Sequence, residues 1–299
     1  MSFNDNIRTS PGRASSGGRG GRGIAIGGGS ALGLIALFVL YQFTGIDLTP
    51  VVTGSQEAPP QQTQSAGEGF EHCTDGAAAN KYDDCRMIAT AESLDAMWSD
   101  LLPEQAGIEY SQPGLVLFKQ SVASGCGQAT SATGPFYCPR DATVYLDTDF
   151  FELLRSQFGA HAGPLAQEYV LAHEVGHHIQ NQLGTFSKYN TQEQGEQGAG
   201  VRSELQADCY AGIWMHYASQ TIDPESGVAF MEPPSDADIR DALEAAQVIG
   251  DDRIQSQAQG YISPDTWTHG SSEQRMSWLK TGLEYGSLAK CDTFSTPRV

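Results

Sequence analysis

The chain is poor in basic residues: 17 Lys and Arg stand against 36 Asp and Glu among 299 residues, a formal net charge of −19. It also has no charged residue over 23–46, no cysteine before Cys73 and no internal repeat. A chain this acidic is repelled by nucleic acid and by anionic lipid faces, so we expect no nucleic-acid partner. The missing early cysteine excludes lipoprotein processing.

The uncharged stretch is apolar over residues 24–43. As a helix, roughly 20 residues span about 30 Å, which matches the hydrocarbon core of a bilayer. Four arginines and one aspartate precede it, and such a positive flank favours the cytoplasmic side. We expect a single-pass transmembrane helix over 23–46 in the cell membrane, with the N-terminus cytoplasmic and the rest of the chain extracytoplasmic. A cleavable signal peptide is the competing interpretation, but no small-x-small cleavage site follows the run.

Composition divides the chain into four parts. Residues 1–22 are rich in Gly, Ser and Arg, and we expect a disordered cytoplasmic N-terminus there. The transmembrane helix over 23–46 follows. Residues 47–70 are rich in Pro, Gln, Ser and Gly, which predicts a flexible linker. Residues 71–299 are long enough for one substantial core, so we expect a single domain.

Hydrophobic periodicity predicts mostly helices in that domain. Helices are expected over 80–102, 149–158, 164–183, 197–218, 235–258 and 272–285, and strands over 114–119 and 143–147. The stretch 220–234 contains prolines and a glycine and is expected to be a loop. The pattern predicts a mainly helical α+β domain with a small β-sheet.

Six cysteines all follow the apolar run, which fits an oxidising compartment. Six cysteines permit fifteen connectivities. Spacing favours two short loops and leaves one long-range pair: Cys73–Cys85, Cys126–Cys138 and Cys209–Cys291.

The most informative motif is His173-Glu174-Val175-Gly176-His177, inside a helix-forming stretch that starts at Pro164. Histidines four residues apart lie on one face of a helix, so both imidazoles reach a single ion. Glu174 is placed to hold a water at that ion and to take its proton. The motif therefore predicts a zinc hydrolase. A glycine inside a helix costs about 1 kcal/mol relative to alanine, so we expect Gly176 where another backbone or the substrate comes close.

Catalytic zinc has three protein ligands and one open position, so a third ligand is needed. In a second helical stretch, Glu204 and Asp208 are four residues apart and share a face. We assign Glu204 as the third ligand and Asp208 as the acceptor that fixes a liganding histidine's tautomer. The reverse assignment stays open. A solvated acidic face is the ordinary alternative, but apolar neighbours predict a buried helix, and buried carboxylates need partners.

With these motifs in view, the chain resembles the neutral zinc metallopeptidase family of bacterial membrane proteins, a gluzincin-like group with HExxH and ExxxD patterns. Blocks that carry the resemblance follow that family's order between residues 73 and 294, at 126–138, 144–151, 173–180, 203–214 and 268–275. The resemblance implies a membrane-anchored, zincin-like peptidase with one zinc ion per chain. It names no substrate.

These residues predict hydrolysis of a peptide or protein substrate by a zinc-activated water, with Glu174 as the general base. Transition-state charge on the carbonyl oxygen needs a donor, for which His269 is the first candidate, ahead of Tyr137 and Tyr210. A role at the start of the helix over 272–285 would explain His269 equally well.

Two other functions stay open. A zinc amidase acting on cell-wall amides shares the chemistry and differs in pocket shape. A catalytically inactive, zinc-stabilised scaffold is disfavoured, because structural zinc sites have four ligands and are typically rich in cysteine. If the substrate is an extended peptide, the strand at 143–147 is a candidate edge for it. Oligomeric state is left without a prediction.

Overall fold

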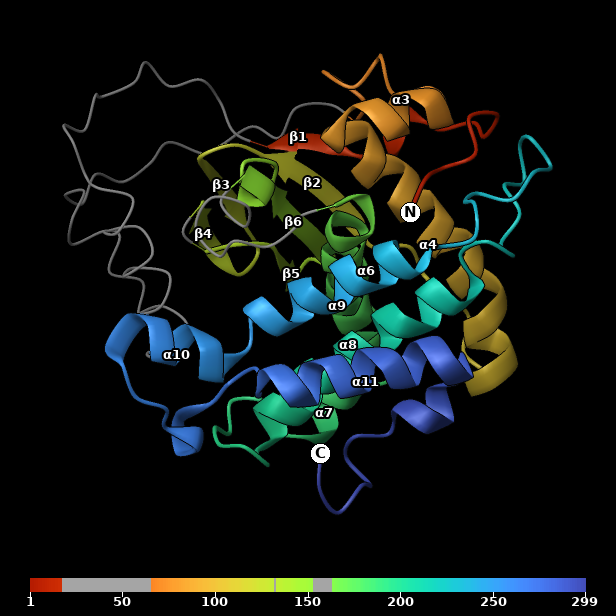
Figure 1. Ribbon diagram of the computed structural model, residues 1–299. Helices are drawn as coiled ribbons and strands as arrows, with labels where there is room; N and C mark the ends of the chain where they lie inside the picture. Colours follow the sequence, from red (N-terminus) through yellow and green to blue (C-terminus); the bar gives the residue numbers. More distant parts are fainter. Residues whose placement is uncertain (18–65, 132, 153–162) are drawn as a thin grey trace, which may run out of the picture.

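Figure 1 shows the computed structural model of the chain, which describes residues 1–17, 66–131, 133–152 and 163–299. The expected transmembrane helix lies outside these residues, as does most of the expected linker. No helix in the described part of the chain is long and apolar enough to cross a membrane.

A small sheet stands beside the helices (Figure 1). The described strands are β1 Ser15–Gly17, β2 Gly114–Phe118, β3 Ser121–Ser124, β4 Gly127–Thr130, β5 Phe136–Cys138 and β6 Thr143–Asp147. Four of them form one sheet in the order β1-β2-β6-β5, and β3 and β4 form a separate hairpin. Strands β1, β2 and β6 run parallel, whereas β5 is antiparallel to β6.

The strands expected at 114–119 and 143–147 are confirmed as β2 and β6. The expectation that the second of these is an edge is wrong, because β6 lies between β2 and β5. In the described four-stranded sheet, β1 and β5 each have a neighbour on one side only, and β5 is the edge next to β6. Its three residues are too short for a periodic signal, which is why the sequence did not reveal it.

Helical residues far outnumber strand residues in the described part of the chain, and the α+β class with a small β-sheet is confirmed. Their bounds are α3 Gly76–Lys81, α4 Asp83–Ala106, α6 Pro164–Gln182, α7 Thr185–Lys188, α8 Ala199–Tyr217, α9 Asp236–Val248, α10 Asp251–Gln259 and α11 Ser272–Tyr285. Single-turn 3₁₀ helices lie at Pro11–Arg13, Pro264–Thr266 and Leu288–Cys291. Helix α8 packs between α6 and α11, as Figure 1 shows.

Most expected helices are confirmed, with two differences. The helix expected over 80–102 belongs to a pair, α3 and α4, separated by the extended backbone of Tyr82. The helix expected over 235–258 is also a pair, α9 and α10, broken before Gly250. A side chain at Gly250 would meet the backbone nitrogen of Ser272 at 2.5 Å, so the chain turns where it touches the start of α11. The helix expected over 149–158 falls largely outside the described residues.

The expected disorder of residues 1–22 is wrong for residues 1–17. This segment, the N-terminal strap, buries Met1, Phe3 and Ile7 in the core and supplies β1 to the sheet. The end of the expected linker is also ordered, since Gly67 donates its backbone N–H to the carbonyl of Ala14 at 2.9 Å. Composition gave the wrong expectation here. A few apolar side chains are enough to dock a segment rich in Gly, Ser and Arg when they are buried in the core of the domain.

The three disulfides favoured by spacing are confirmed. They join Cys73 to Cys85, Cys126 to Cys138 and Cys209 to Cys291. The third has a sequence separation of 82 residues and ties the C-terminal segment to α8.

Two glycines set the distance between α8 and α11. A side-chain carbon at Gly212 would collide with the carbonyl oxygen of Leu279, and one at Gly282 would collide with the carbonyl oxygen of Cys209. The two helix backbones are therefore in direct contact, and neither glycine can be replaced without moving a helix.

The variant Gly282→Ala tests this contact. We expect a loss of about 1–3 kcal/mol in the free energy of unfolding, because the added methyl group overpacks the helix interface. Urea unfolding followed by circular dichroism measures it. Ser277→Ala, on the exposed face of the same helix, is the control and should change little; equal stability of the two variants would show that the interface can absorb a methyl group.

Candidate metal centre and active site

Helices α6 and α8 bring the three expected metal ligands together. His173 and His177 lie one turn apart on α6, with ring centroids 4.8 Å apart. Glu204 of α8 faces both, its Oε2 at 3.2 Å from His173 Nε2 and its Oε1 at 3.5 Å from His177 Nε2. The ligand atoms all lie within 4.8 Å of one another, as binding to a single ion requires.

Each histidine ring is oriented through its other nitrogen. His173 Nδ1 lies 2.8 Å from Asp208 Oδ1, and His177 Nδ1 lies 2.9 Å from Gln180 Oε1. Both partners accept a hydrogen bond from the Nδ1–H group, so both Nε2 atoms face Glu204 with a lone pair available for an ion. The ligand-type atoms that converge are those of His173, His177 and Glu204, whereas Asp208 contacts the outer ring nitrogen of His173. The sequence analysis missed Gln180, whose signal is a polar residue three positions after His177 in an apolar helix.

Asp208 is also the centre of a buried hydrogen-bond network. It accepts from the hydroxyl of Tyr169 at 2.6 Å and from Arg275 Nε at 2.9 Å and Nη2 at 3.0 Å. Burial raises the pKa of Asp208, but Arg275 and His173 lower it to about 2. The sequence analysis missed both partners. Tyr169 stands one turn before His173, which is a usable signal, whereas nothing local pointed from Arg275 to Asp208.

The charges around the rings suit a divalent cation. Burial lowers the pKa of His173, but Asp208 and Glu204 raise it to about 10. Burial raises the pKa of Glu204, but His177 and His173 hold it well below its usual range. The pocket therefore favours positive charge on its rings, and a bound metal ion replaces those protons. Two imidazole nitrogens and one carboxylate fit the ligand set of catalytic zinc.

Gly176 is explained by the contact between these two helices. A side-chain carbon at this position would lie 2.9 Å from the carbonyl oxygen of Ala207 and 3.1 Å from its Cα. The expectation that another backbone comes close is confirmed. The glycine lets α8 approach α6 near enough for Glu204 to reach both histidines.

The ligands open onto a cavity of about 640 Å³. Glu174 lines it and is 8% exposed. His269, from the loop before α11, lines the same cavity. The structure thus brings the expected general base and the expected oxyanion donor to one space with the three ligands.

Asp251 holds the His269 loop. Its Oδ2 accepts the backbone N–H groups of Thr268, His269 and Gly270 at 2.7, 2.7 and 3.0 Å. The ring nitrogen Nδ1 of His269 lies 2.8 Å from Thr268 Oγ1 and 3.4 Å from Asp251 Oδ1. These contacts use Nδ1 and leave Nε2 for a ligand in the cavity. The sequence analysis missed Asp251, because its partners lie about twenty residues away along the chain.

The helix that follows His269 has its own capping residue. Ser271 accepts the backbone N–H of Gln274, and Gln274 bonds back to Ser271 in a capping box. The cap of α11 is therefore Ser271, and His269 is not needed for it.

The two tyrosines named behind His269 have other roles. Tyr137 lines the cavity, but its hydroxyl is engaged, accepting from Asn181 Nδ2 at 2.9 Å and lying 3.0 Å from His178 Nδ1. Tyr210 is 3% exposed and packs edge-to-face on Trp98. His178 has a structural contact, with its Nε2 at 2.6 Å from the carbonyl oxygen of Ser111.

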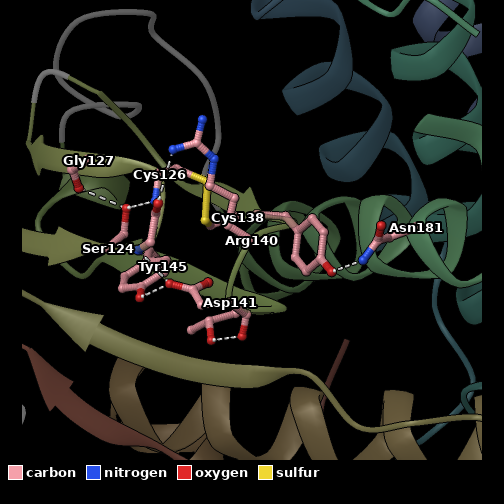
Figure 2. Close-up of a disulfide and its surroundings, with 11 residues drawn as sticks. Ser124, Cys126, Gly127, Cys138, Arg140, Asp141, Tyr145 and Asn181 are labelled. Carbon is pink, nitrogen blue, oxygen red and sulfur yellow. Dashed lines mark hydrogen bonds between the residues drawn. A yellow bond between two sulfur atoms is a disulfide. The ribbon is translucent and has the colours of Figure 1, made fainter. Parts of the chain in front are cut away.

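Figure 2 shows the disulfide between Cys126 and Cys138, and Phe136 and Tyr137 of β5 line the cavity beside it. The bond between Cys126 and Cys138 joins the turn of the β3-β4 hairpin to the end of β5. Asp141 strengthens this link by accepting from the backbone of Gly125 at 2.6 Å and from the hydroxyl of Tyr145 at 2.8 Å. The hairpin and the edge strand are therefore held as one unit beside the ligands.

A second group of ligand-type residues, His72, Cys73, Asp84 and Cys85, also lies close together. Its two cysteines are bonded to each other. No thiolate is available there, so the described residues contain one credible metal centre.

Asp208→Asn tests the orienting role of the buried carboxylate. We expect metal affinity to fall about 10- to 100-fold, the usual cost of losing an outer partner of a liganding histidine. Competition with a chromophoric chelator measures it, with circular dichroism to show that the variant is folded. Glu273→Gln, an exposed change on α11, is the control; unchanged affinity in Asp208→Asn would exclude the orienting role.

The comparisons with known proteins agree with this geometry. A family model described as "Putative neutral zinc metallopeptidase" matches residues 2–294. The Mycobacterium tuberculosis (strain H37Rv) protein named "Uncharacterized protein Rv2575" is 49% identical over 244 residues, covering 82% of each chain. The Escherichia coli (strain K12) protein named "Uncharacterized protein YpfJ" is 40% identical over 291 residues, covering 94% of this chain and 93% of that one.

No solved structure matches the chain. The family model spans nearly the whole sequence, including the HExxH helix and the helix with Glu204 and Asp208. The chain therefore belongs to the neutral zinc metallopeptidase family that this model describes.

Proposed function

We propose that the protein is a zinc-dependent peptidase that hydrolyses peptide bonds in a peptide or protein substrate, with one zinc ion held by His173, His177 and Glu204. The observation that carries the proposal is the convergence of three ligand atoms on an open cavity that Glu174 also lines. Structural zinc sites are closed by four protein ligands, whereas catalytic sites keep one position open. When bound, zinc supplies Lewis acidity, which polarises a carbonyl oxygen and acidifies water.

The residues divide the remaining work. Glu174 takes a proton from the attacking water and then delivers it to the leaving amine. His269 donates a hydrogen bond from Nε2 to the carbonyl oxygen as negative charge develops there. Asp251 and Thr268 fix the ring of His269 through Nδ1, so the donor needs no rearrangement during the reaction.

The edge strand favours a peptide over a small amide as the substrate. In the described sheet, β5 pairs with β6 on one side, and its residues Phe136 and Tyr137 line the cavity. Extended peptides add to such edges through main-chain hydrogen bonds. A zinc amidase for cell-wall amides shares the chemistry but has no use for this edge.

Two features of the chain bear on its location in the cell: its disulfides and its apolar segment. The three disulfides in the described chain favour an oxidising, extracytoplasmic compartment for the catalytic domain. Membrane attachment through residues 23–46 rests on their apolar sequence.

Glu174→Gln tests the general base. We expect peptide hydrolysis to fall at least about 100-fold with zinc content unchanged, because the amide keeps the size of the side chain and cannot accept the proton. A diverse peptide library, digested and read by mass spectrometry, measures cleavage and preference, and metal analysis measures zinc. Removing zinc with a chelator should abolish the parent's activity, and adding zinc back should restore it.

Glu193→Gln is the matched control, since Glu193 lines the same cavity and is exposed. It should cleave like the parent. Hydrolysis that survives in Glu174→Gln would remove the proposed base. If the zinc-loaded parent cleaves no peptide in the library, the amidase or the inactive scaffold would be favoured.

His269→Gln separates transition-state stabilisation from binding. We expect kcat to fall about 100- to 1000-fold with little change in KM, because the hydrogen bond strengthens only as charge develops on the oxygen. Steady-state kinetics on the best library peptide measures both constants. A raised KM with unchanged kcat would make His269 a substrate-binding residue instead.

A further inference from the structure

The N-terminal strap is embedded in the surface of the catalytic domain. Met1, Phe3 and Ile7 are 1%, 2% and 0% exposed. Phe3 also forms an isolated β-bridge with Met231 and donates its backbone N–H to Asn80 Oδ1 at 2.9 Å. Burying a large apolar side chain contributes about 1.5–3 kcal/mol, so these three alone provide a substantial driving force for docking.

Polar contacts fix the next part of the strap. The backbone N–H of Ser10 donates to Glu92 Oε1 at 2.8 Å, and Arg13 Nε lies 2.6 Å from Asp95 Oδ2. Thr9 Oγ1 donates to the carbonyl oxygen of Cys73 at 3.0 Å. A strap segment with basic side chains thus lies against carboxylates of α4 and against the residue that begins the first disulfide.

The domain is shaped to receive the strap. A side-chain carbon at Gly76 would collide with the carbonyl oxygen of Asn4, so the first residue of α3 has no side chain where the strap crosses it. A side-chain carbon at Gly17 would lie 2.6 Å from Val116 Cγ1 and 2.9 Å from Val122 Cγ2. Glycines on both partners make the close approach possible.

The strap also completes the sheet. Strand β1 pairs in parallel with β2 over three residues, from Ser15 opposite Val116 to Gly17 opposite Phe118. Without β1, an apolar strand would present an unpaired edge, which folded proteins avoid. Figure 1 shows β1 along the outer side of β2, on the same face of the molecule as α3.

We infer that residues 1–17 and residues 66–299 lie on the same side of any membrane that the chain meets. The contacts between them are direct hydrogen bonds, and a bilayer core of about 30 Å cannot lie between their atoms. The strap is therefore a structural part of the catalytic domain and is not a cytoplasmic tail. This holds whether the strap docks on its own domain or on that of a second copy.

The topology predicted from the arginines before residue 23, with a cytoplasmic N-terminus and an extracytoplasmic domain, conflicts with these contacts. The positive-inside rule is a bias that depends on free arginines, and Arg13, one of the four counted, is paired with Asp95. Crossing a membrane would expose three core side chains and remove Arg13 from Asp95, which would keep only the neutral donors Tyr110 and Gln112. The docking contacts outweigh the bias, and the disulfides favour the extracytoplasmic side for both segments.

Thiol labelling of the full-length protein in intact cells tests the inference. All six cysteines are in disulfides, so Asn6→Cys and, separately, Ser277→Cys each give one free thiol at an exposed position. We expect a membrane-impermeant maleimide to label both variants alike, before permeabilisation. Labelling of both only after permeabilisation would keep them on one side and move that side to the cytoplasm. Labelling of Ser277→Cys before and Asn6→Cys only after permeabilisation would overturn the inference.

A second measurement tests docking without reference to membranes or activity. Gly76→Val should release the strap and speed trypsin cleavage after Arg13 at least about tenfold, because proteolysis follows the population of the open form. Ala77→Val places the same valine side chain at the exposed next position of α3 and should leave the rate unchanged. Cleavage of the parent as fast as Gly76→Val would show that the strap is not docked. Neither result depends on whether the protein is a peptidase.

Discussion

The structure depends on one buried carboxylate, that of Asp208. It lies on α8, accepts from His173 and Tyr169 of α6, and pairs with Arg275 of α11. Breaking a buried ion pair costs about 3–5 kcal/mol, because one charge is left without a partner. The same group orients His173, a proposed metal ligand, and joins three helices, so the proposed metal site cannot be altered independently of the core.

A disulfide and two close backbone contacts restrain the segment of α8 around Asp208. Cys209, the next residue, is bonded to Cys291, and its carbonyl oxygen touches Gly282 of α11. Ala207, the residue before, touches Gly176 of the metal helix. Backbone contacts at both neighbours leave Asp208 little freedom, which explains why two glycines are placed in helix interiors where they cost about 1 kcal/mol each in propensity.

The sequence predicted contacts between residues a few positions apart, and it did not predict contacts between residues far apart in the chain. Histidines at four-residue spacing, and Glu204 with Asp208 at the same spacing, share helix faces by geometry alone, so the ligand set followed from α6 and α8. Arg275 and Asp251 could not be found this way, because their partners come from other elements. The N-terminal strap was predicted wrongly for a different reason. Composition averages over all residues of a segment, whereas the strap is held by a few buried side chains, of which Phe3 is one.

Two separate parts of the chain line the cavity next to Glu204. The ligands stand on α6 and α8, whereas His269 stands on a loop organised by Asp251 at the start of α10. Arg275 reaches both: its guanidinium bonds Asp208 behind His173, and its Nη1 donates to the carbonyl oxygen of Ile249 at 3.3 Å, two residues before Asp251. A transition-state donor is effective only when it is held at a fixed distance from the reacting carbonyl. One buried arginine therefore links the proposed metal ligands to the loop of the proposed donor and fixes the spacing between them.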